Sequence, residues 1–364
     1  MKRFLANAAL VLGSLAVAFA LGEVAVRVLL KDTNVLFPRY HTDYRYGSYT
    51  LRGIRPNAEF WHSSIDGKWR FVTDSRGFRD TREFAYAKPA GTLRILALGD
   101  SHTQGYEVRQ ESTFSAIAES YLNGRGRRSE VINAGVSGFG TAEELAFLEA
   151  EGYKYQPDVV VLGFYANDFV DNLKAGLFGL DAEGRLQALK YEHIPGVRIQ
   201  NAIYAVAPVR WLSENSYFYS LLFNGVWVHF KEKLTHAATA EYAVATTSGL
   251  SAQESDLAAA LIERMQRFCT ERGIRLIVVD IPQEAGAKHI APSMPEALAG
   301  RLARAGVEVI APNELFADYD GTLEMHVAHG NHHISEFTHA LIGVEIGRRI
   351  NGAGLRRTAG RRSD

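Results

Sequence analysis

Cysteine is almost absent from this chain, and neither sign of charge predominates. Cys269 is the only cysteine among 364 residues, which excludes an intrachain disulfide and any zinc or iron–sulfur site built from several cysteines. The formal net charge is −1, so the overall composition gives no indication of nucleic-acid binding. Phosphate-binding loops, dinucleotide fingerprints and the Gly-x-Ser-x-Gly pattern are missing as well.

A long uncharged run is present at the N-terminus. The nineteen residues from Phe4 to Gly22 carry no charge and follow Lys2 and Arg3. As a helix such a run is about 28 Å long, which is close to the hydrocarbon thickness of a bilayer. We therefore expect residues 1–31 to be a signal anchor that places the rest of the chain outside the cytoplasm, in the periplasm or the extracellular space. Cleavage after Ala20 would instead give a secreted protein.

Short apolar runs alternate with helical patterns through most of the chain. The runs are residues 94–99, 130–135, 159–164, 275–282 and 307–312. Uninterrupted apolar strands indicate a parallel sheet that helices cover on both faces. The sequence therefore predicts an α/β fold, a doubly wound, three-layer domain with about five parallel strands, whose sites lie beyond the carboxyl ends of the strands.

Three other segments flank or interrupt this domain, which we place at residues 93–352. Residues 32–92 form an aromatic-rich lead-in, in which the alternation of "KWRFVTD" predicts a strand or hairpin. Residues 172–250 form a mostly helical insertion that could be a lid, a substrate wall or a packing accessory. Residues 353–364 form a basic tail that we expect to be solvated and disordered.

The first apolar run ends abruptly in a serine. Residues 93–105 read "LRILALGDSHTQG", so Ser101 follows directly on a buried strand. The serine could cap a helix, Gly99 could close a tight turn, or Ser101 could be a nucleophile. A serine nucleophile needs a base within hydrogen-bond reach and donors for the developing oxyanion. We expect the neighbouring His102 to be a wall residue that points away.

Glycines and an asparagine follow the next two strands. The second run continues into "NAGVSGFGT" (133–141), where a glycine N–H could donate to an oxyanion or simply belong to a tight turn. The third run leads into "FYANDF", where the Asn167 amide could donate to an oxyanion or cap the next helix. Three strand ends thus direct serine, glycine and asparagine towards one crevice.

Histidines cluster around the start of the last amphipathic helix and offer candidate bases. They are His326, His329, His332, His333 and His339. Ser335 and Glu336 are typical of a helix N-terminus, which places the preceding histidines at the N-terminal end of this helix. Histidine is also the commonest metal ligand, but Glu324 is the only carboxylate at close spacing. We expect neither a metal nor a cofactor.

Serine, glycine, asparagine and histidine in this order resemble the SGNH (GDSL) hydrolase superfamily, whose fold is flavodoxin-like. "GDSHTQG" is similar to its nucleophile block, which implies that Ser101 is the nucleophile and that its backbone N–H is an oxyanion donor. "NAGVSGFGT" and "YAND" imply Gly138 and Asn167 as the other donors, and "HHISEFTH" implies His333 as the catalytic histidine. The segments "DSRGFRD" and "KPAGTLRILALGDS" further resemble a membrane-anchored bacterial branch of this superfamily.

The sequence departs from the family pattern in two respects. Tyr165 stands where the asparagine block normally has glycine, and Asn331 and Gly330 stand at the two positions where the family can have an aspartate that orients the histidine. In a serine protease an Asp→Asn change at the orienting position costs about 10⁴-fold in rate. Asn331 or a backbone carbonyl could hold His333 in a Ser–His dyad, the site could be degenerate, or another acid could reach His333. The candidate acids are Asp318, Asp320 and Glu324.

The resemblance implies an extracytoplasmic serine esterase that acts through an acyl-serine intermediate. Its expected partner is an O-acylated cell-envelope substrate, such as an acetylated glycan or a lipid ester, and nucleic acid is not expected. One alternative uses the same residues to transfer the acyl group to a polysaccharide. An alternative of another class is a catalytically degenerate protein that binds carbohydrate or lipid. Asn331 suggests this alternative, because it replaces the aspartate that orients the histidine.

Overall fold

Five parallel strands form the central sheet of the computed structural model, in the order β14-β11-β7-β5-β6. The structure describes residues 1–30, 36, 40–223, 225–226, 252–285, 289–330 and 332–359. The five strands are β5 (Leu93–Gly99), β6 (Ser129–Asn133), β7 (Val159–Phe164), β11 (Arg275–Asp280) and β14 (Glu308–Ile310). They coincide with the five apolar runs, so the predicted doubly wound sheet is confirmed.

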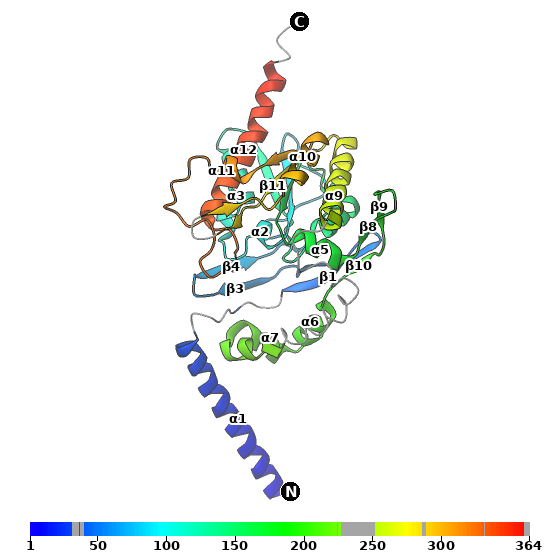
Figure 1. The fold of residues 1–364 in the computed structure, drawn as a ribbon. Helices are drawn as coiled ribbons and strands as arrows, with labels where there is room; N and C mark the ends of the chain where they lie inside the picture. The colour runs from blue at the N-terminus through cyan, green and yellow to red at the C-terminus, as the bar shows by residue number, and fades with distance from the viewer. Residues whose placement is uncertain are drawn as a thin grey trace.

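Two groups of helices cover the two faces of this sheet (Figure 1). One face carries α4 (Thr141–Ala150), α5 (Asp168–Ala175), α9 (Ala252–Glu271) and α10 (Glu296–Arg304). The other face carries α3 (Phe114–Asn123) and α12 (Glu336–Ala359). Alternate strand residues enter the two cores, with Leu96 and Leu98 of β5 on the first side and Ile95 and Ala97 on the second. Burial on both faces explains why each strand reads as a continuous apolar run.

Short elements connect these layers. They are α2 (Ser101–Gln104), the 3-10 turns η1 (Gln110–Ser112) and η2 (Gly152–Tyr155), β12 (Gln283–Glu284), β13 (Ile290–Ala291) and α11 (Pro312–Leu315). Helix α12 is described as far as Ala359, so it includes the first part of the basic tail. Residues 360–364 lie outside the described residues.

The aromatic lead-in folds against the face that carries α4. Strands β1 (His41–Tyr46) and β2 (Tyr49–Ile54) are antiparallel, and β3 (Glu59–Ser63) pairs with β4 (Lys68–Val72) as the predicted hairpin. The ring of Tyr46 packs edge-on against Phe147 of α4, with 5.0 Å between centroids. The lead-in is therefore a packed part of the molecule.

The insertion begins with strands and continues as helices. Strands β8 (Phe178–Leu180) and β9 (Leu186–Ala188) form a hairpin, and β10 (Glu192–His193) pairs in parallel with β2. Helices α6 (Val197–Tyr204) and α7 (Ala207–Asn215) follow, and residues 217–223 are helical as well. Residues 227–251 lie outside the described residues.

Helix α1 (Lys2–Leu29) projects from one side of the molecule, with its N-terminal end pointing away from the body (Figure 1). Within the described ranges it is the one helix that is long and apolar enough to cross a membrane, and its most hydrophobic stretch has no buried residue. Figure 1 places α6 and α7 between α1 and the sheet, while α12 leaves the opposite side of the molecule.

Candidate active site

Ser101 is the first residue of α2, immediately beyond the carboxyl end of β5. The Asp100 side chain accepts a hydrogen bond from the backbone N–H of His102 at 2.8 Å and so caps this short helix. The N–H of a first helical residue has no acceptor within its own helix, which leaves the Ser101 N–H available. Gly99 is required before the turn, because a Cβ there would lie 1.9 Å from Thr103 Oγ1.

Ser101 and His333 are hydrogen-bonded although 232 residues separate them, with 2.8 Å between Ser101 Oγ and His333 Nε2. The other ring nitrogen, Nδ1, lies 2.5 Å from the carbonyl oxygen of Gly330. A carbonyl only accepts hydrogen bonds, so Nδ1 carries the proton and Nε2 is free to accept one from the serine. Because both ring nitrogens of His333 are engaged in this way, Asp318, Asp320 and Glu324 make no direct contact with them.

Two flat side chains enclose the ring of His333. Tyr106 stacks on it with 4.3 Å between ring centroids, and His102 stacks on it at 4.7 Å. The expectation that His102 points away is therefore wrong, because its ring is held between His333 and Tyr165. Burial, reinforced by the nearby His102, lowers the pKa of His333 to about 4. Burial also lowers the pKa of His102 to about 3. Both rings are thus neutral at pH 7, and His333 is in the form that a general base requires.

The loop that carries His333 is anchored through its other histidines. His329 binds Asp66 through both its backbone N–H and Nδ1, at 2.8 Å each. His332 Nδ1 lies 2.8 Å from Glu284 Oε2, and His326 Nε2 lies 3.1 Å from the carbonyl oxygen of Pro282. The histidines thus have separate partners on different segments, and the described residues hold no cluster of ligands suited to a metal. Asn331 lies outside the described residues.

The glycine turn after β6 lies against both α2 and the lead-in. The backbone N–H of Ser137 donates to Gln104 Oε1 in α2 at 3.0 Å. Gly138 has φ of +78°, and its carbonyl accepts a hydrogen bond from the guanidinium of Arg52 in β2. The positive φ favours glycine, and an added Cβ would also lie 2.3 Å from Arg52 Nη2. Within the described part of the chain, the Gly138 N–H has no hydrogen-bond acceptor.

Asn167 lies beside the serine turn, at the start of α5. Its Nδ2 donates to Asp100 Oδ2 at 3.2 Å and to Asp171 Oδ2 at 3.0 Å. The amide is therefore next to the residue that precedes Ser101, with its hydrogens directed at two carboxylates. To donate to an oxyanion, it would have to exchange one of these carboxylates for the substrate oxygen.

Three buried carboxyl groups lie beneath this turn. Burial raises the pKa of Asp100, and it raises those of Glu144 and Asp168 well above their ordinary values, with mutual repulsion adding to the effect. Asp168 accepts a hydrogen bond from Thr141 Oγ1 at 3.0 Å. Neither carboxyl oxygen of Glu144 has a hydrogen-bond partner among the described residues. A neutral Glu144 is the consequence, because an unpaired buried carboxylate is very costly.

Arg79 is the second arginine of the "DSRGFRD" segment in the lead-in, and it connects this segment to the serine turn. Its buried guanidinium donates to the carbonyl oxygens of Gln104 at 2.7 Å, Gly105 at 2.5 Å and Val108 at 2.6 Å. These carbonyls lie at the last residue of α2 and just after it, so Arg79 fixes the turn between Ser101 and Tyr106. Sequence reasoning assigned no such role to Arg79, Tyr106 or Arg52, because a contact with backbone carbonyls or a ring face leaves no spacing pattern.

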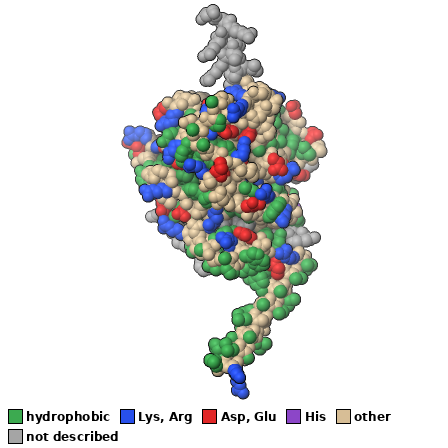
Figure 2. All heavy atoms as spheres, turned by 180° about the vertical axis from the view of Figure 1, so that it is seen from behind, with side chains coloured by type: hydrophobic (Ala, Val, Ile, Leu, Met, Phe, Trp, Pro, Cys, Tyr) green, Lys and Arg blue, Asp and Glu red, His purple; other side chains and the backbone are tan. Residues whose placement is uncertain are grey.

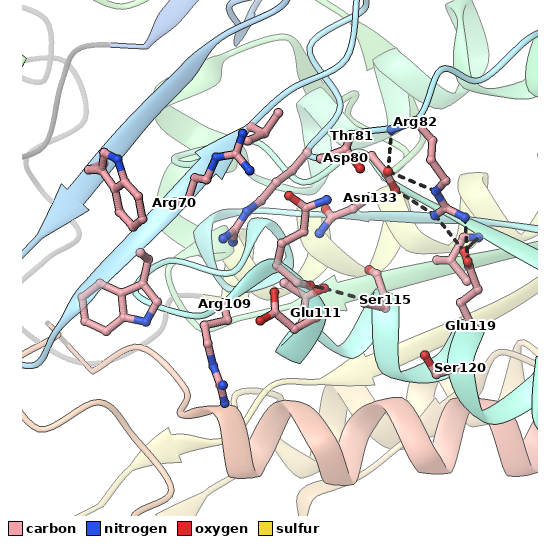
Figure 3. A pocket seen from close by; sticks show the side chains of 18 of the residues that line it. Arg70, Asp80, Thr81, Arg82, Arg109, Glu111, Ser115, Glu119, Ser120 and Asn133 are labelled. Carbon is pink, nitrogen blue, oxygen red and sulfur yellow. Dashed lines mark hydrogen bonds and ion pairs between the residues drawn. The ribbon is translucent and has the colours of Figure 1, made fainter.

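A groove of about 570 Å³ runs between the β3–β4 hairpin and α3 (Figure 3). Trp61, Trp69 and Arg70 line it on the hairpin, and Arg109 lines it on the other side. Arg82 closes one end, where it pairs with Asp80 and Glu119 (Figure 3). Arg109 also binds Glu336, three residues after His333, so the groove borders the histidine loop.

Comparison with known proteins supports the same family. The model of the GDSL-like lipase/acylhydrolase family matches residues 97–341. A lipase/acylhydrolase from Enterococcus faecalis has a similar structure, with 19% identity, 72% coverage of this chain, 96% coverage of the other and a TM-score of 0.41. A GDSL-like lipase from Bacteroides thetaiotaomicron is 11% identical, with 74% coverage of this chain, 93% coverage of the other and a TM-score of 0.37. No curated protein sequence matches this chain.

Proposed function

Because the chain belongs to the GDSL-like lipase/acylhydrolase family and is an ester-hydrolysing enzyme, we propose that Ser101 and His333 form its catalytic dyad. The observation that carries this proposal is the 2.8 Å contact between Ser101 Oγ and His333 Nε2, with His333 Nδ1 held by the Gly330 carbonyl. A serine next to a neutral, oriented imidazole is the arrangement that activates a hydroxyl for acyl transfer. An engaged and oriented histidine also argues against the catalytically degenerate alternative.

In the first half of the reaction, Ser101 Oγ attacks the ester carbonyl while His333 Nε2 takes the hydroxyl proton. The carbonyl oxygen becomes an oxyanion, which the N–H groups of Ser101 and Gly138 and the Asn167 amide stabilise. The bond to the alcohol then breaks, and the imidazolium returns its proton to the leaving oxygen. The low pKa of His333, about 4, makes this imidazolium a strong acid for that step.

In the second half, water releases the acyl group. His333 Nε2 takes a proton from the water as its oxygen adds to the acyl carbon, and the oxyanion forms again on the same donors. The bond to Ser101 Oγ breaks, and the serine regains a proton from Nε2. The products are the free carboxylic acid and the enzyme in its starting state, and none of these steps needs a cofactor.

We place the enzyme outside the cytoplasm, with α1 as its membrane anchor and residues 93–352 as its catalytic domain. Lys2 and Arg3 precede the apolar run, which favours a cytoplasmic N-terminus. The substrate class is an O-acylated glycan or lipid ester of the cell envelope. The groove that borders the histidine loop supports the glycan, because Trp61 and Trp69 in its lining offer flat apolar faces on which a sugar ring can pack, while Ser101 and His333 lie outside that lining.

The test is acyl release from an acetylated oligosaccharide and from an aryl acetate by the full-length enzyme in detergent. We expect wild type to release acetate and Ser101→Ala to be slower by at least about 10³-fold, as is typical when a serine nucleophile is removed. Full activity in Ser101→Ala would contradict the proposal. Adding an unacylated oligosaccharide separates hydrolysis from transfer, since a transferase would give an acetylated oligosaccharide in place of free acetate.

A further inference from the structure

Helix α1 packs against a helical segment of the insertion through one stripe of side chains. The least exposed residues of its C-terminal half are Phe19, Gly22, Glu23 and Val26, which is the spacing of one helix face. The ring of Phe19 meets that of Phe218 edge-on, with 5.2 Å between centroids. Gly22 permits this approach, because a Cβ there would lie 2.9 Å from the Phe218 ring.

Glu23 caps the helical segment at residues 217–223. Its carboxylate accepts hydrogen bonds from the N–H groups of Tyr217 at 3.1 Å and Phe218 at 2.9 Å, and from Ser216 Oγ at 2.7 Å. The first N–H groups of a helix need acceptors from outside it, and the positive end of the helix dipole favours a carboxylate. Arg27 adds a hydrogen bond to the Asn215 carbonyl at 2.9 Å. The position of this segment relative to α1 is therefore fixed.

This packing determines how deep the segment lies if α1 spans a bilayer. Phe19 and Gly22 belong to the uncharged run that would fill the hydrocarbon layer, whereas Glu23 and Arg27 are the first charges beyond it. Phe218 packs on the last turn of the run, so residues 217–223 must lie at the boundary between acyl chains and headgroups. No other depth is compatible with the contacts to α1.

Large apolar side chains are exposed on the same part of the insertion. Trp211 of α7 is 61% exposed and Leu222 is 52% exposed. The other members of this exposed apolar set are Ile199, Val206, Leu221 and Val226. Figure 2 shows hydrophobic side chains continuing from α1 onto the adjoining underside of the globular body. A tryptophan among aliphatic side chains is typical of helices that lie in a membrane interface.

We propose that α6, α7, residues 217–223 and residues 225–226 form a platform that lies on the outer leaflet of the bilayer in which α1 is anchored. This inference rests on the membrane anchoring proposed above and adds a second, peripheral contact with the lipid. This surface should contact lipid, because it is fixed against the end of a membrane-spanning helix and therefore faces the headgroups.

The platform is also connected rigidly to the catalytic domain. Asn201 of α6 accepts a hydrogen bond at 2.8 Å from Arg55, which directly follows β2, and donates one to Asp43 of β1 at 2.9 Å. Strand β2 itself carries Arg52, which binds the carbonyl of Gly138. The platform therefore holds the active site at a set height above the membrane, suited to ester groups presented at the membrane surface.

The test is site-directed spin labelling of the full-length protein in phosphatidylcholine/phosphatidylglycerol vesicles. Cys269 is buried, so labels attach to introduced cysteines. Leu222→Cys and Trp211→Cys report on the platform and Leu12→Cys reports on the anchor. Leu323→Cys is the matched control, because Leu323 is also 52% exposed but belongs to the segment between α11 and α12, two helices that lie on the other side of β3 and β4 from α1 (Figure 1). Unchanged hydrolysis of a soluble ester verifies that each variant is folded.

The accessibility of each label to oxygen, which concentrates in lipid, is compared with its accessibility to a water-soluble nickel chelate. We expect the ratio at residues 222 and 211 to be several-fold higher than at residue 323 and lower than at residue 12. Ratios at 222 and 211 equal to that at 323 would overturn the platform while leaving the anchor intact. Protection from both reagents would also overturn it, because a second protein copy would then cover the surface. A water-exposed label at residue 12 would overturn the anchor and the platform together.

Discussion

The carbonyl oxygen of Gly330 lies 2.5 Å from Nδ1 of His333, in the position where a catalytic aspartate would bind the histidine. The same carbonyl accepts the backbone N–H of His333 at 3.1 Å, so a single tight turn sets both the position and the tautomer of the ring. A carbonyl dipole orients the imidazole as a carboxylate does, but it brings no full negative charge to stabilise the imidazolium. This geometry supports the proposed Ser101–His333 dyad.

Replacing Asn331 tests whether the backbone carbonyl suffices. We expect Asn331→Ala to keep kcat/KM for an aryl acetate within about tenfold of wild type, because the Gly330 carbonyl supplies the orientation. His333→Ala in the same assay should lose at least about 10³-fold. An Asn331→Ala enzyme as impaired as His333→Ala would show that Asn331 is the orienting residue and that this account of the dyad is wrong.

The pH dependence of kcat/KM reports the protonation of His333. Burial lowers its pKa to about 4, and the ring must be neutral to accept the serine proton. Activity should therefore persist through pH 5 and be lost as the pH falls through about 4, whereas a histidine with an ordinary pKa would already lose half its activity at about 6.5. Samples returned to pH 7 serve as the control for irreversible unfolding. A half-loss near pH 6.5 would contradict the buried, neutral site.

Arg79 should matter for stability more than any surface arginine. Arg79→Ala leaves the carbonyls of Gln104 and Val108 buried without a donor, at about 1–3 kcal/mol each, and leaves the Gly105 carbonyl with only the N–H of Val108. We expect a loss of at least about 2 kcal/mol in urea unfolding monitored in detergent. The exposed Arg70, which pairs with Glu59, is the matched control, and Arg70→Ala should cost less than about 1 kcal/mol. Equal losses in the two variants would refute the role of Arg79.

Glu144 should make the protein less stable as the pH rises. Its pKa is raised well above 4.5 in the folded protein, so above pH 4.5 the unfolded chain releases a proton that the folded chain retains. Wild-type stability then falls by up to about 1.4 kcal/mol per pH unit until the folded pKa is reached. Glu144→Gln removes this effect, so its advantage in Tm over wild type should grow from pH 4.5 to pH 7. A difference in Tm that does not vary with pH would be inconsistent with a neutral buried carboxyl.

The sheet and the serine turn could be predicted because their determinants are local. Each core strand is an unbroken apolar run, and Ser101 and Asn167 directly follow two of these runs. The family resemblance supplied Gly138 and His333, and the structure brings His333 to Ser101. The roles of the proposed oxyanion donors remain predictions, since an oxyanion forms only with substrate.

Other parts of the site could not be predicted because their partners are distant or belong to the backbone. Gly330 contributes only a carbonyl, which every residue possesses. The contact between Arg52 and Gly138 spans 86 residues, and the contact between Glu23 and Tyr217 spans 194. Such pairs depend on how the lead-in and the insertion pack, which hydrophobic periodicity does not encode.

Labelling with a fluorophosphonate tests the activated serine most directly, because the reagent phosphonylates a serine only when its hydroxyl is activated. Wild type, Ser101→Ala, His333→Ala and the exposed-serine control Ser120→Ala are compared as full-length proteins in detergent. We predict labelling of wild type and Ser120→Ala at residue 101, and loss of labelling in both Ser101→Ala and His333→Ala. Folded wild type that does not react, or labelling that survives in Ser101→Ala, would contradict the Ser101–His333 dyad.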